Sequence, residues 1–472
     1  MACLSNKNTY LVFGIGITGK AVVNFLQQQK LHFYVANDDI DALRNFNLDE
    51  KLKIYDLNEQ SLRQKGINFL ILSPSVHAQD NPHKAVLLAK KLGVQIIPDI
   101  DLFYEHVILY NQTHNTDKKI IAITGTNGKS TTTVLTAFLF NQIGKSAIAC
   151  GNTGLNALSV DVDKYDYFVV EMSSYNLFLM KHARFDSGVL LNITKDHLEY
   201  HGNMENYIDA KIKAIKQAEK KVLCIDSEYT KNAIEKITNS KEDKNEVVCV
   251  SKMQILKNGW SWQDDTYYYN GVKIFTGSFQ NLPGLHNVEN IICSIACVAE
   301  TLGVNNDVSF IKKIFEKVSL FNGLPHRLQF IRTIDSVDFV NDSKATNADS
   351  TQKALQAFNE ADIYLIAGGR RKTEGFLSLK NDLKNVTCVF LIGEASDSFA
   401  EELNILNIKY IKCQNMRNAV KNAFNMAKQF LNVSKKKTVL LSPLCASFDQ
   451  YNSFEERGQD FIQIVNAIAE NR

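Results

Sequence analysis

The chain has no excess of either charge and no long hydrophobic run. Its 472 residues include 53 Lys and Arg against 51 Asp and Glu, which gives a formal net charge of +2. Such a balance of charges does not favour electrostatic binding of nucleic acid or of an anionic membrane surface. No stretch approaches the ~20 apolar residues that a membrane-spanning helix needs. The N-terminus lacks a charged leader followed by an apolar stretch, so we expect a cytoplasmic protein without membrane or nucleic-acid partners.

Closely paired cysteines are also missing. The nine cysteines are scattered, odd in number and without a CxxC pair. This pattern argues against a disulfide framework and against a structural zinc site, and it fits a reducing compartment. At roughly 100–200 residues per domain, the chain length predicts two to four domains.

Apolar runs alternate with amphipathic stretches in three successive segments. The first begins TYLVFGIGITGKAVVNFLQQQ, the second IIAITGTNGKSTTT, and the third contains DIYLIAGG and TVLLSPL. The polar residues 110–119 between the first two segments resemble a linker. Strands that alternate with helices predict parallel sheets. We therefore predict an α/β protein of three domains: a Rossmann-like domain (1–108), a central P-loop ATPase-like parallel sheet (109–320) and a second Rossmann-like domain (321–472).

The stretch ITGTNGKSTTT, residues 123–133, indicates a phosphate-binding loop. Glycines let backbone N–H groups point at an anion, and the following helix adds the positive end of its dipole. Lys129 can bridge phosphates, and Ser130 can hold Mg²⁺ through its hydroxyl. The standard loop has a glycine where this chain has Ile123, so the loop is a shortened variant. The residues predicted to bind ATP here are Gly125, Thr126, Asn127, Gly128, Lys129, Ser130 and Thr131.

Two further strand ends supply the candidate metal ligands Glu171 and His197. Glu171 ends the apolar run YFVVE, and Asp196 and His197 follow the run GVLLNIT. We expect all three at the same edge of the sheet as the phosphate loop. A strand-ending surface Glu and a structural His are the ordinary alternatives, but the neighbouring phosphate site favours metal binding.

The first segment carries the glycine pattern Gly14-x-Gly16-x-x-Gly19. Asp38 follows nineteen residues after Gly19, within the range for an acid that binds a ribose. The pattern is weak support for a nicotinamide cofactor. It predicts that a diphosphate can approach the backbone, and UDP carries a diphosphate too.

These motifs together resemble the Mur ligase family over the whole chain. TGTNGKST, EMSSYNL, NITKDHLEYHG, LPGLHNVEN, GLPHRLQ, NDSKATN and SPLCASFDQYNSFEERG occur in the family's order. The last two resemble the branch that adds D-glutamate, and the NPR motif expected in the branch that adds diaminopimelate or lysine is absent. The resemblance implies ATP-dependent ligation of D-glutamate to UDP-N-acetylmuramoyl-L-alanine through an acyl phosphate, by a monomer, during peptidoglycan precursor synthesis.

The resemblance also implies roles for individual residues. Two Mg²⁺ ions are expected, and Lys211 would be carbamylated to serve as a metal ligand; a solvated helix lysine is its ordinary alternative. The implied catalytic residues are Lys129, Glu171, His197, Lys211 and Asn152, and the implied metal ligands are Ser130, Glu171, His197 and Lys211. Further ATP contacts are implied for Asn287 and Asn290 near adenine, Arg327 at the γ-phosphate and Asp342 at the ribose.

Two substrate pockets follow from the same match. The UDP substrate is expected at Gly16, Ile17, Thr18, Gly19, Asp38, Ser73, Pro74, Asn152 and Ser173, with Asn37 as an alternative to Asp38. D-Glutamate, which carries two carboxylates, is expected at Lys344, Thr346, Lys372, Ser447 and Phe454. Three positions depart from the family pattern: Ser75 replaces glycine, Asn176 stands where Gln is common, and Arg370 stands where an acid is common. Cys445 has no partnered base in sequence and is interpreted as a packing residue.

Three other functions remain open at this point. A sister ligase would use another amino acid, a P-loop switch or motor would hydrolyse the nucleotide without an acceptor, and a dehydrogenase would bind a nicotinamide cofactor through the first segment. Because acyl phosphates hydrolyse in water, we also expect the third segment to close onto the second about residue 320.

Overall fold

The computed structural model describes residues 3–73, 76, 82–238, 247–279, 281–371, 375–429 and 435–470. The predicted site residues Pro74 and Lys372, and the substituted Ser75, lie outside these ranges. The chain divides into a first unit, Met1–Gly277 with Glu289–Val318, and a second unit, Ser278–Val288 with Ser319–Arg472. The predicted domain boundaries at 108 and 320 remain predictions.

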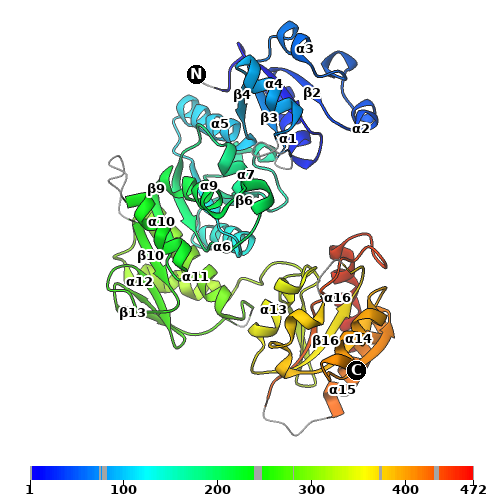
Figure 1. Cartoon of the computed structure of the whole chain (residues 1–472). Helices are drawn as coiled ribbons and strands as arrows, with labels where there is room; N and C mark the ends of the chain where they lie inside the picture. Colours follow the sequence, from blue (N-terminus) through cyan, green and yellow to red (C-terminus); the bar gives the residue numbers. More distant parts are fainter. Residues whose placement is uncertain are drawn as a thin grey trace. The chain divides into compact units, whose positions relative to one another are not determined.

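The N-terminal part of the first unit is a parallel four-stranded sheet in the order β2-β1-β3-β4 (blue in Figure 1). Its strands are β1 (Thr9–Phe13), β2 (His32–Ala36), β3 (Phe69–Leu72) and β4 (Gln95–Ile97). Its helices are α1 (Ile17–Gln28), α2 (Ile40–Asn45), η1 (Glu50–Leu52), α3 (Glu59–Gln64), α4 (Lys84–Leu92) and α5 (Asp99–His114). A Cβ on Gly19 would lie 1.8 Å from the carbonyl oxygen of Gly14, so the tight turn between β1 and α1 requires glycine there.

The rest of the first unit is built on a nine-stranded sheet in the order β13-β12-β11-β10-β9-β8-β5-β7-β6. The strands are β5 (Lys119–Thr124), β6 (Ala147–Gly151), β7 (Tyr167–Glu171), β8 (Phe185–Leu190), β9 (Ala218–Cys224), β10 (Val247–Ser251), β11 (Trp260–Gln263), β12 (Thr266–Tyr269) and β13 (Val272–Thr276). Strands β5 to β10 pair in parallel, and β11 to β13 form an antiparallel meander.

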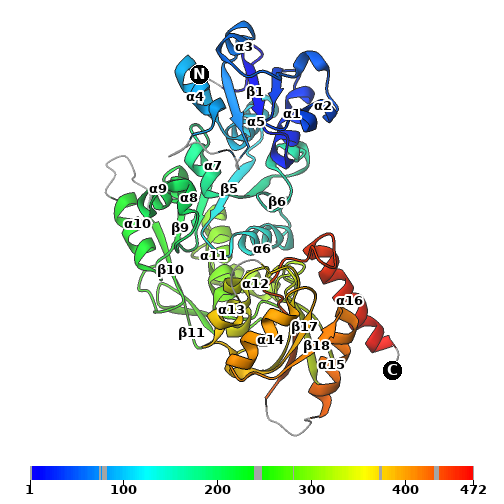
Figure 2. The ribbon, with the colours of Figure 1, turned by 45° about the vertical axis from the view of Figure 1, so that its right-hand side comes forward.

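Helices follow or surround the strands of this central sheet, among them α6, which contacts β6 and β7 and is labelled with β6 in Figure 2. They are α6 (Lys129–Gln142), η2 (Ala157–Ser159), η3 (Val162–Lys164), α7 (Ser174–Leu179), α8 (Leu198–His201), α9 (Met204–Lys216), α10 (Glu228–Thr238), α11 (Leu285–Leu302) and α12 (Val308–Val318). Because β5 to β10 run in parallel, the loops that follow them meet at one edge of the sheet, where ligands bind in folds of this type.

One hydrophobic core joins the two sheets of the first unit. It contains Tyr10 on β1, Phe103 and Val107 on α5, and Phe168 on β7. The rings of Phe103 and Phe168 pack edge to face, with centroids 5.4 Å apart. The expected linker at 110–119 is therefore wrong in its first half, since α5 continues to His114 before β5 begins.

The second unit contains a six-stranded sheet in the order β14-β15-β19-β16-β17-β18. Its strands are β14 (Gln329–Ile334), β15 (Val337–Asn341), β16 (Asp362–Gly368), β17 (Val386–Ile392), β18 (Tyr410–Gln414) and β19 (Lys437–Leu441), and its helices are α13 (Ala348–Ala357), η4 (Phe376–Leu379), η5 (Leu383–Asn385), α14 (Ser396–Ile405), α15 (Met416–Gln429) and α16 (Phe454–Glu470). Only β14 pairs antiparallel with its neighbour in this sheet.

Alternate residues of β16 pack on opposite faces of this sheet, as the two-residue period of a strand requires. Leu365 lies in a cluster with Leu355 on α13 and Phe399 on α14. Ile366 lies in another cluster with Val420 on α15 and Phe461 on α16. The sheet is thus covered on both faces. None of the helices in the described part of the chain combines the length and hydrophobicity needed to cross a lipid bilayer.

Candidate functional site

The predicted phosphate loop connects β5 to α6, in the expected strand–loop–helix arrangement. Gly128 precedes the helix with φ 82°, and a Cβ there would lie 2.2 Å from Oδ1 of Asn290. Nζ of Lys129 donates to the carbonyl oxygens of Gly125, at 3.0 Å, and Thr126, at 2.9 Å. The lysine ammonium therefore lies against the loop itself, beside the N-terminus of α6.

A second lysine reaches the same loop from α9. Lys211 is only 1% exposed, which excludes the solvated alternative. Its Nζ donates to the carbonyl oxygen of Gly125 at 2.7 Å and lies 4.8 Å from the ring centroid of Tyr207. Burial, and then repulsion by Lys129, hold the pKa of Lys211 well below its usual range. A buried amine with a lowered pKa is a better nucleophile than an ordinary surface lysine.

Glu171 meets the requirements of a magnesium ligand. It ends β7, is 3% exposed, and its Oε2 has no hydrogen-bond partner among the described residues. An unpaired buried carboxylate oxygen is costly unless a cation compensates it. The Glu171 carboxylate and the hydroxyl of Ser130 at the start of α6 are hard oxygen donors of the kind that Mg²⁺ prefers. The residues present therefore fit the implied ion.

A cavity of about 530 Å³ brings several predicted residues together. It is lined by Lys129, Asn152, Ser173, Ser174, Tyr175, His197, Glu199, Tyr200, Tyr207 and Lys211. His197 takes a left-handed backbone conformation, φ 51°, and its Nδ1 lies 2.9 Å from the hydroxyl of Tyr175. Ser173, predicted for the UDP substrate, lines this cavity together with the predicted catalytic groups.

The aromatic residues of this cavity were missed by the sequence analysis. Tyr175 packs edge to face on Tyr200, with ring centroids 4.3 Å apart, and His201 lies 5.3 Å from the ring of Tyr207. Burial lowers the pKa of His201 to about 4, so this ring is neutral at pH 7. The density of aromatic residues in EMSSYNL and DHLEYHG was the available signal.

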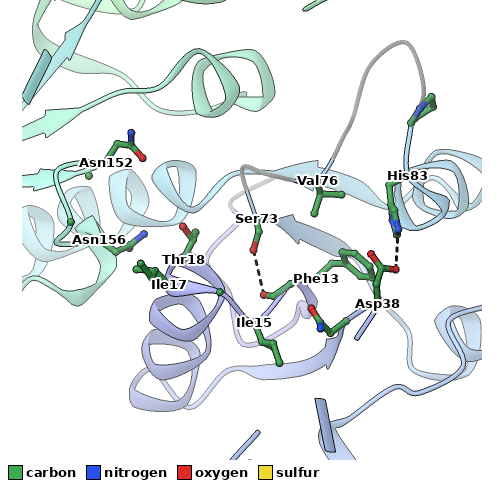
Figure 3. Close-up of a pocket in the computed structure, with 16 residues that line it drawn as sticks. Phe13, Ile15, Ile17, Thr18, Asp38, Ser73, Val76, His83, Asn152 and Asn156 are labelled. Carbon is green, nitrogen blue, oxygen red and sulfur yellow. Dashed lines mark hydrogen bonds and ion pairs between the residues drawn. The ribbon is translucent and has the colours of Figure 1, made fainter. Parts of the chain in front are cut away.

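A larger cavity of about 830 Å³ lies at the carboxyl edge of the N-terminal sheet (Figure 3). The predicted residues that line it are Gly16, Ile17, Thr18, Asn37, Asp38, Ser73 and Asn152. Gly19 does not line it but forms the turn beneath it. Asn152 lines both cavities, so this residue lies at the boundary of each.

His83 is a wall residue of the larger cavity that the sequence did not single out. Its Nε2 lies 3.0 Å from Oδ1 of Asp38, and its ring packs on Phe13 with centroids 4.7 Å apart. The backbone N–H of Ala85 donates to Nδ1 of His83 at 3.1 Å, so Nε2 carries the proton and donates to Asp38.

The second unit holds the predicted contacts of the ATP ribose and of D-glutamate. Asp342 accepts hydrogen bonds from the backbone N–H of Leu328, at 3.2 Å, and from Oγ of Ser442, at 2.9 Å. Burial raises the pKa of Asp342 to about 7. Nζ of Lys344 lies 5.1 Å from the ring centroid of Phe454. The remaining described residues of this set are Arg327, beside Asp342, and Thr346 and Ser447, which follow β15 and β19.

Arg457 organises this region and was also missed. It is buried on α16, and its Nη2 donates to the carbonyl oxygens of Ser343, at 2.8 Å, and Cys445, at 3.1 Å. Burial raises the pKa of the Cys445 thiol to about 12, which agrees with a packing role. The unusual Arg370 pairs with Glu394 at 3.3 Å, so its charge is balanced locally.

The two asparagines predicted near adenine have separate partners. Oδ1 of Asn290 accepts from Oγ1 of Thr132 on α6 at 3.1 Å. Nδ2 of Asn287 donates to the carbonyl oxygen of Pro283 at 2.8 Å. The substituted Asn176 lies between Oγ of Ser173, at 3.2 Å, and Oδ1 of Asp99, also at 3.2 Å.

Comparison with known protein families gives two matches. The Mur ligase middle domain matches residues 123–298, and the Mur ligase glutamate ligase domain matches residues 326–445. A relative from Wolbachia pipientis wMel, named UDP-N-acetylmuramoylalanine--D-glutamate ligase, is 33% identical over 99% of this chain and 97% of its own length. A relative of the same name from Rickettsia prowazekii (strain Madrid E) is 35% identical over 96% of each chain.

Solved structures resemble the chain in fold. The UDP-N-acetylmuramate-alanine ligase MurC from Thermotoga maritima aligns with a TM-score of 0.56 and 17% identity over 98% of this chain and 99% of its own. The MurF ligase from Thermotoga maritima, solved in complex with ADP, aligns with a TM-score of 0.54 and 17% identity over 86% and 92%. These likenesses confirm the predicted α/β class and its three-domain architecture.

Proposed function

This chain belongs to the Mur ligase family, and from that premise we propose that it joins D-glutamate to UDP-N-acetylmuramoyl-L-alanine at the expense of ATP, a step of peptidoglycan precursor synthesis. One observation carries the proposal: Lys129 and Lys211 converge on the phosphate loop in a cavity that shares Asn152 with the larger cavity at the glycine turn. Such an arrangement lets a nucleotide sugar and a triphosphate approach each other from two sides.

The proposed reaction has two steps. The alanyl carboxylate of the UDP substrate attacks the γ-phosphorus of ATP, so that an acyl phosphate forms and ADP leaves. The amine of D-glutamate then attacks the acyl carbon, and the tetrahedral intermediate collapses to an amide as phosphate leaves. At about 4 Å each pair of unit negative charges repels by roughly 4 kcal/mol at an effective dielectric of 20. The first step therefore needs concentrated positive charge.

Residues of the first unit either carry that positive charge or would bind the metal ions that carry it. Lys129 exchanges its two loop carbonyls for phosphate oxygens when ATP binds. Magnesium, when bound, adds charge that stabilises the transferred phosphoryl group. Ser130 and Glu171 would hold one ion, and the unpaired Oε2 of Glu171 supports this. His197 and a carbamylated Lys211 would hold a second.

The buried state of Lys211 supports its carbamylation. Carbamylation joins the neutral ε-amine to the carbon of CO₂, releases a proton and leaves an anionic oxygen donor. The lowered pKa of Lys211 makes the neutral amine more available than that of an ordinary surface lysine. The same change would replace the repulsion between Lys211 and Lys129 by an attraction.

The amino-acid acceptor is assigned to the second unit. We propose that Lys344, Thr346, Ser447 and Phe454 bind D-glutamate, together with Lys372 outside the described residues. The hydrogen bonds from Nη2 of Arg457 to the carbonyl oxygens of Ser343 and Cys445 support this. They connect the loops after β15 and β19, which carry three of these residues. We further propose a cytoplasmic location and a monomeric state.

Product analysis tests the proposal. The purified chain is incubated with UDP-N-acetylmuramoyl-L-alanine, ATP and Mg²⁺, and with D-glutamate, L-glutamate or another amino acid in turn. We expect phosphate release and an amide product of the correct mass with D-glutamate only. Lys129→Ala should abolish both. Product with another amino acid would identify a sister ligase, and hydrolysis of ATP without any acceptor would identify a switch or motor.

A further inference from the structure

Four polar residues with no role assigned above lie beside the phosphate loop. Asn192, Asp226 and Lys252 follow β8, β9 and β10, so they lie in a row at the carboxyl edge of the central sheet. Glu289 reaches them from α11 and is only 5% exposed. The ammonium of Lys252 pairs with Oε2 of Glu289 and lies 3.7 Å from Oδ2 of Asp226.

Asn192 holds the peptide of Asn127 at two points. Its Oδ1 accepts the backbone N–H of Asn127 at 2.8 Å, and its Nδ2 donates to the carbonyl oxygen of Asn127 at 3.2 Å. The carbonyl oxygen of Asn192 accepts the backbone N–H of Thr126 at 2.8 Å. Two successive residues of the phosphate loop are therefore fixed by one side chain and its backbone.

Glu289 determines which way the Asn192 amide faces. Nδ2 of Asn192 donates to Oε1 of Glu289 at 2.6 Å. An ionised carboxylate can only accept hydrogen bonds, so the NH₂ group must face Glu289 and the oxygen must face the N–H of Asn127. With the amide reversed, two donors would face each other at Asn127. The Glu289 carboxylate thus sets the orientation of the clamp on the loop.

Lys252 places a positive charge against that buried carboxylate. A carboxylate out of water protonates unless an opposite charge compensates it. The ligand atoms of Cys224, Asp226 and Glu289 lie within 4.8 Å of one another, a grouping that could hold a metal ion. The Lys252 ammonium is already placed against two of these groups. Burial alone would lower the pKa of Lys252, but the neighbouring acidic groups, Glu289 first and Asp226 among them, together outweigh burial and the pKa is raised.

We propose that Lys252, Glu289 and Asn192 form a relay of positioning residues that fixes the phosphate loop in its nucleotide-binding shape and so sets the affinity for ATP without contacting it. Lys252 acts as a built-in cation in place of a metal. The inference rests on the proposed function only in taking a purine nucleotide as the ligand of the loop.

Binding of ADP with Mg²⁺ to the full-length chain, measured by isothermal titration calorimetry, tests the relay without any need for turnover. Glu289→Gln keeps the shape but offers a donor to Asn192, so the clamp loses its fixed orientation. We expect the ADP dissociation constant to rise about tenfold for Glu289→Gln and for Lys252→Met. Lys252→Arg, which keeps the cation, should stay within twofold of wild type. The KM for ATP should follow the ADP affinity, while the KM of the other two substrates stays unchanged.

Lys118→Met is the matched control. Lys118 is a buried lysine of the same unit, its Nζ donates to the carbonyl oxygen of Tyr165 at 2.8 Å, and it lies 3.5 Å from Asp166. It precedes β5, at the opposite end of that strand from the phosphate loop. Loss of this lysine should lower stability without changing ADP affinity.

The outcomes separate cleanly. ADP affinities within twofold of wild type in Glu289→Gln and Lys252→Met would overturn the relay, whatever their stability. Lys252 is partly exposed, so Lys252→Met carries the test alone if Glu289→Gln fails to fold. The effects of Lys252→Met and Asn192→Ala should also be less than additive, since the lysine acts through the asparagine. The variants could lower ADP affinity as expected while the wild-type chain forms no amide product. That combination would support the relay and refute the proposed function.

Discussion

Replacing Lys211 by methionine should stabilise the unmodified protein while it removes the proposed activity. Lys211 and Lys129 donate to the same carbonyl oxygen, that of Gly125, at 2.7 and 3.0 Å. Two charged ammonium groups about 5 Å apart would repel by about 3 kcal/mol at an effective dielectric of about 20. Burial adds to this cost, so the folded chain holds Lys211 with a lowered pKa, and the cost to stability appears as the proton that the amine gives up. Methionine is one atom shorter than lysine, unbranched and uncharged, so it fills most of the same space without this cost.

The loss of one hydrogen bond opposes the gain only in part. A buried hydrogen bond contributes about 1 kcal/mol net, and the Gly125 oxygen keeps its bond from Lys129. We therefore expect Lys211→Met to raise the free energy of unfolding by about 2 kcal/mol at pH 7. The pKa of Lys211 is lower in the folded than in the unfolded chain, so the unfolded state binds more protons. Wild-type stability should thus rise as the pH increases toward the unfolded lysine pKa of about 10, and Lys211→Met should lack this rise.

Urea unfolding in bicarbonate-free buffer measures the effect on the unmodified amine. Both tryptophans, Trp260 and Trp262, lie in the first unit, so their fluorescence reports on the unit that contains Lys211. Phosphate release with D-glutamate, measured in parallel, should fall at least a hundredfold. A variant that is less stable than wild type by more than 1 kcal/mol, or that keeps the rise with pH, would refute the electrostatic reasoning.

Three other substitutions have expected outcomes. Glu171→Gln should raise the Mg²⁺ concentration needed for half-maximal ADP binding at least tenfold in calorimetry. It should leave urea stability equal or higher, because a buried carboxylate oxygen without a hydrogen-bond partner among the described residues is removed. An unchanged Mg²⁺ requirement would contradict it. Gly128→Ala should lower the free energy of unfolding in urea by about 1–2 kcal/mol, since φ is 82° and the new Cβ would lie 2.2 Å from Oδ1 of Asn290. It should also weaken ADP binding. A substitution with no effect on stability would mean that the loop relaxes freely. Asp342 has a pKa of about 7 in the folded chain, so it contributes stability that is lost as the pH rises from about 4 to 7, at up to about 1.4 kcal/mol per pH unit. Calorimetric unfolding of Asp342→Asn should lack that slope. A wild-type slope of the opposite sign would rule this out.

The phosphate loop and the metal-binding candidates could be predicted because each is encoded locally. Glycines followed by Lys129 and Ser130 come directly after a strand, and Glu171 comes at the tip of another. A parallel sheet then brings such strand ends to one edge without further information. The arrangement of these residues in the fold thus follows from short motifs and one topological rule.

The relay beside the loop could not be predicted, because it depends on long-range pairing. Asn192 and Glu289 are 97 residues apart in the chain, and Lys252 comes from a third strand end. In sequence each resembles an ordinary solvated side chain. The end of α5 was missed for a different reason. Its last turn is polar, but Nδ2 of Asn111 donates to the carbonyl oxygen of Lys118 at 3.0 Å and so closes the helix end locally.

The core that β1, α5 and β7 share has a consequence for protein engineering. Consider a chimera in which the N-terminal domain is replaced by a different domain that binds a nucleotide sugar. A junction after residue 108 would fail, because it would separate the hydrophobic face of α5 from the side chains that pack against it. The chimera would need α5 and the β7 residues that contact it, above all Phe168, from the same parent protein.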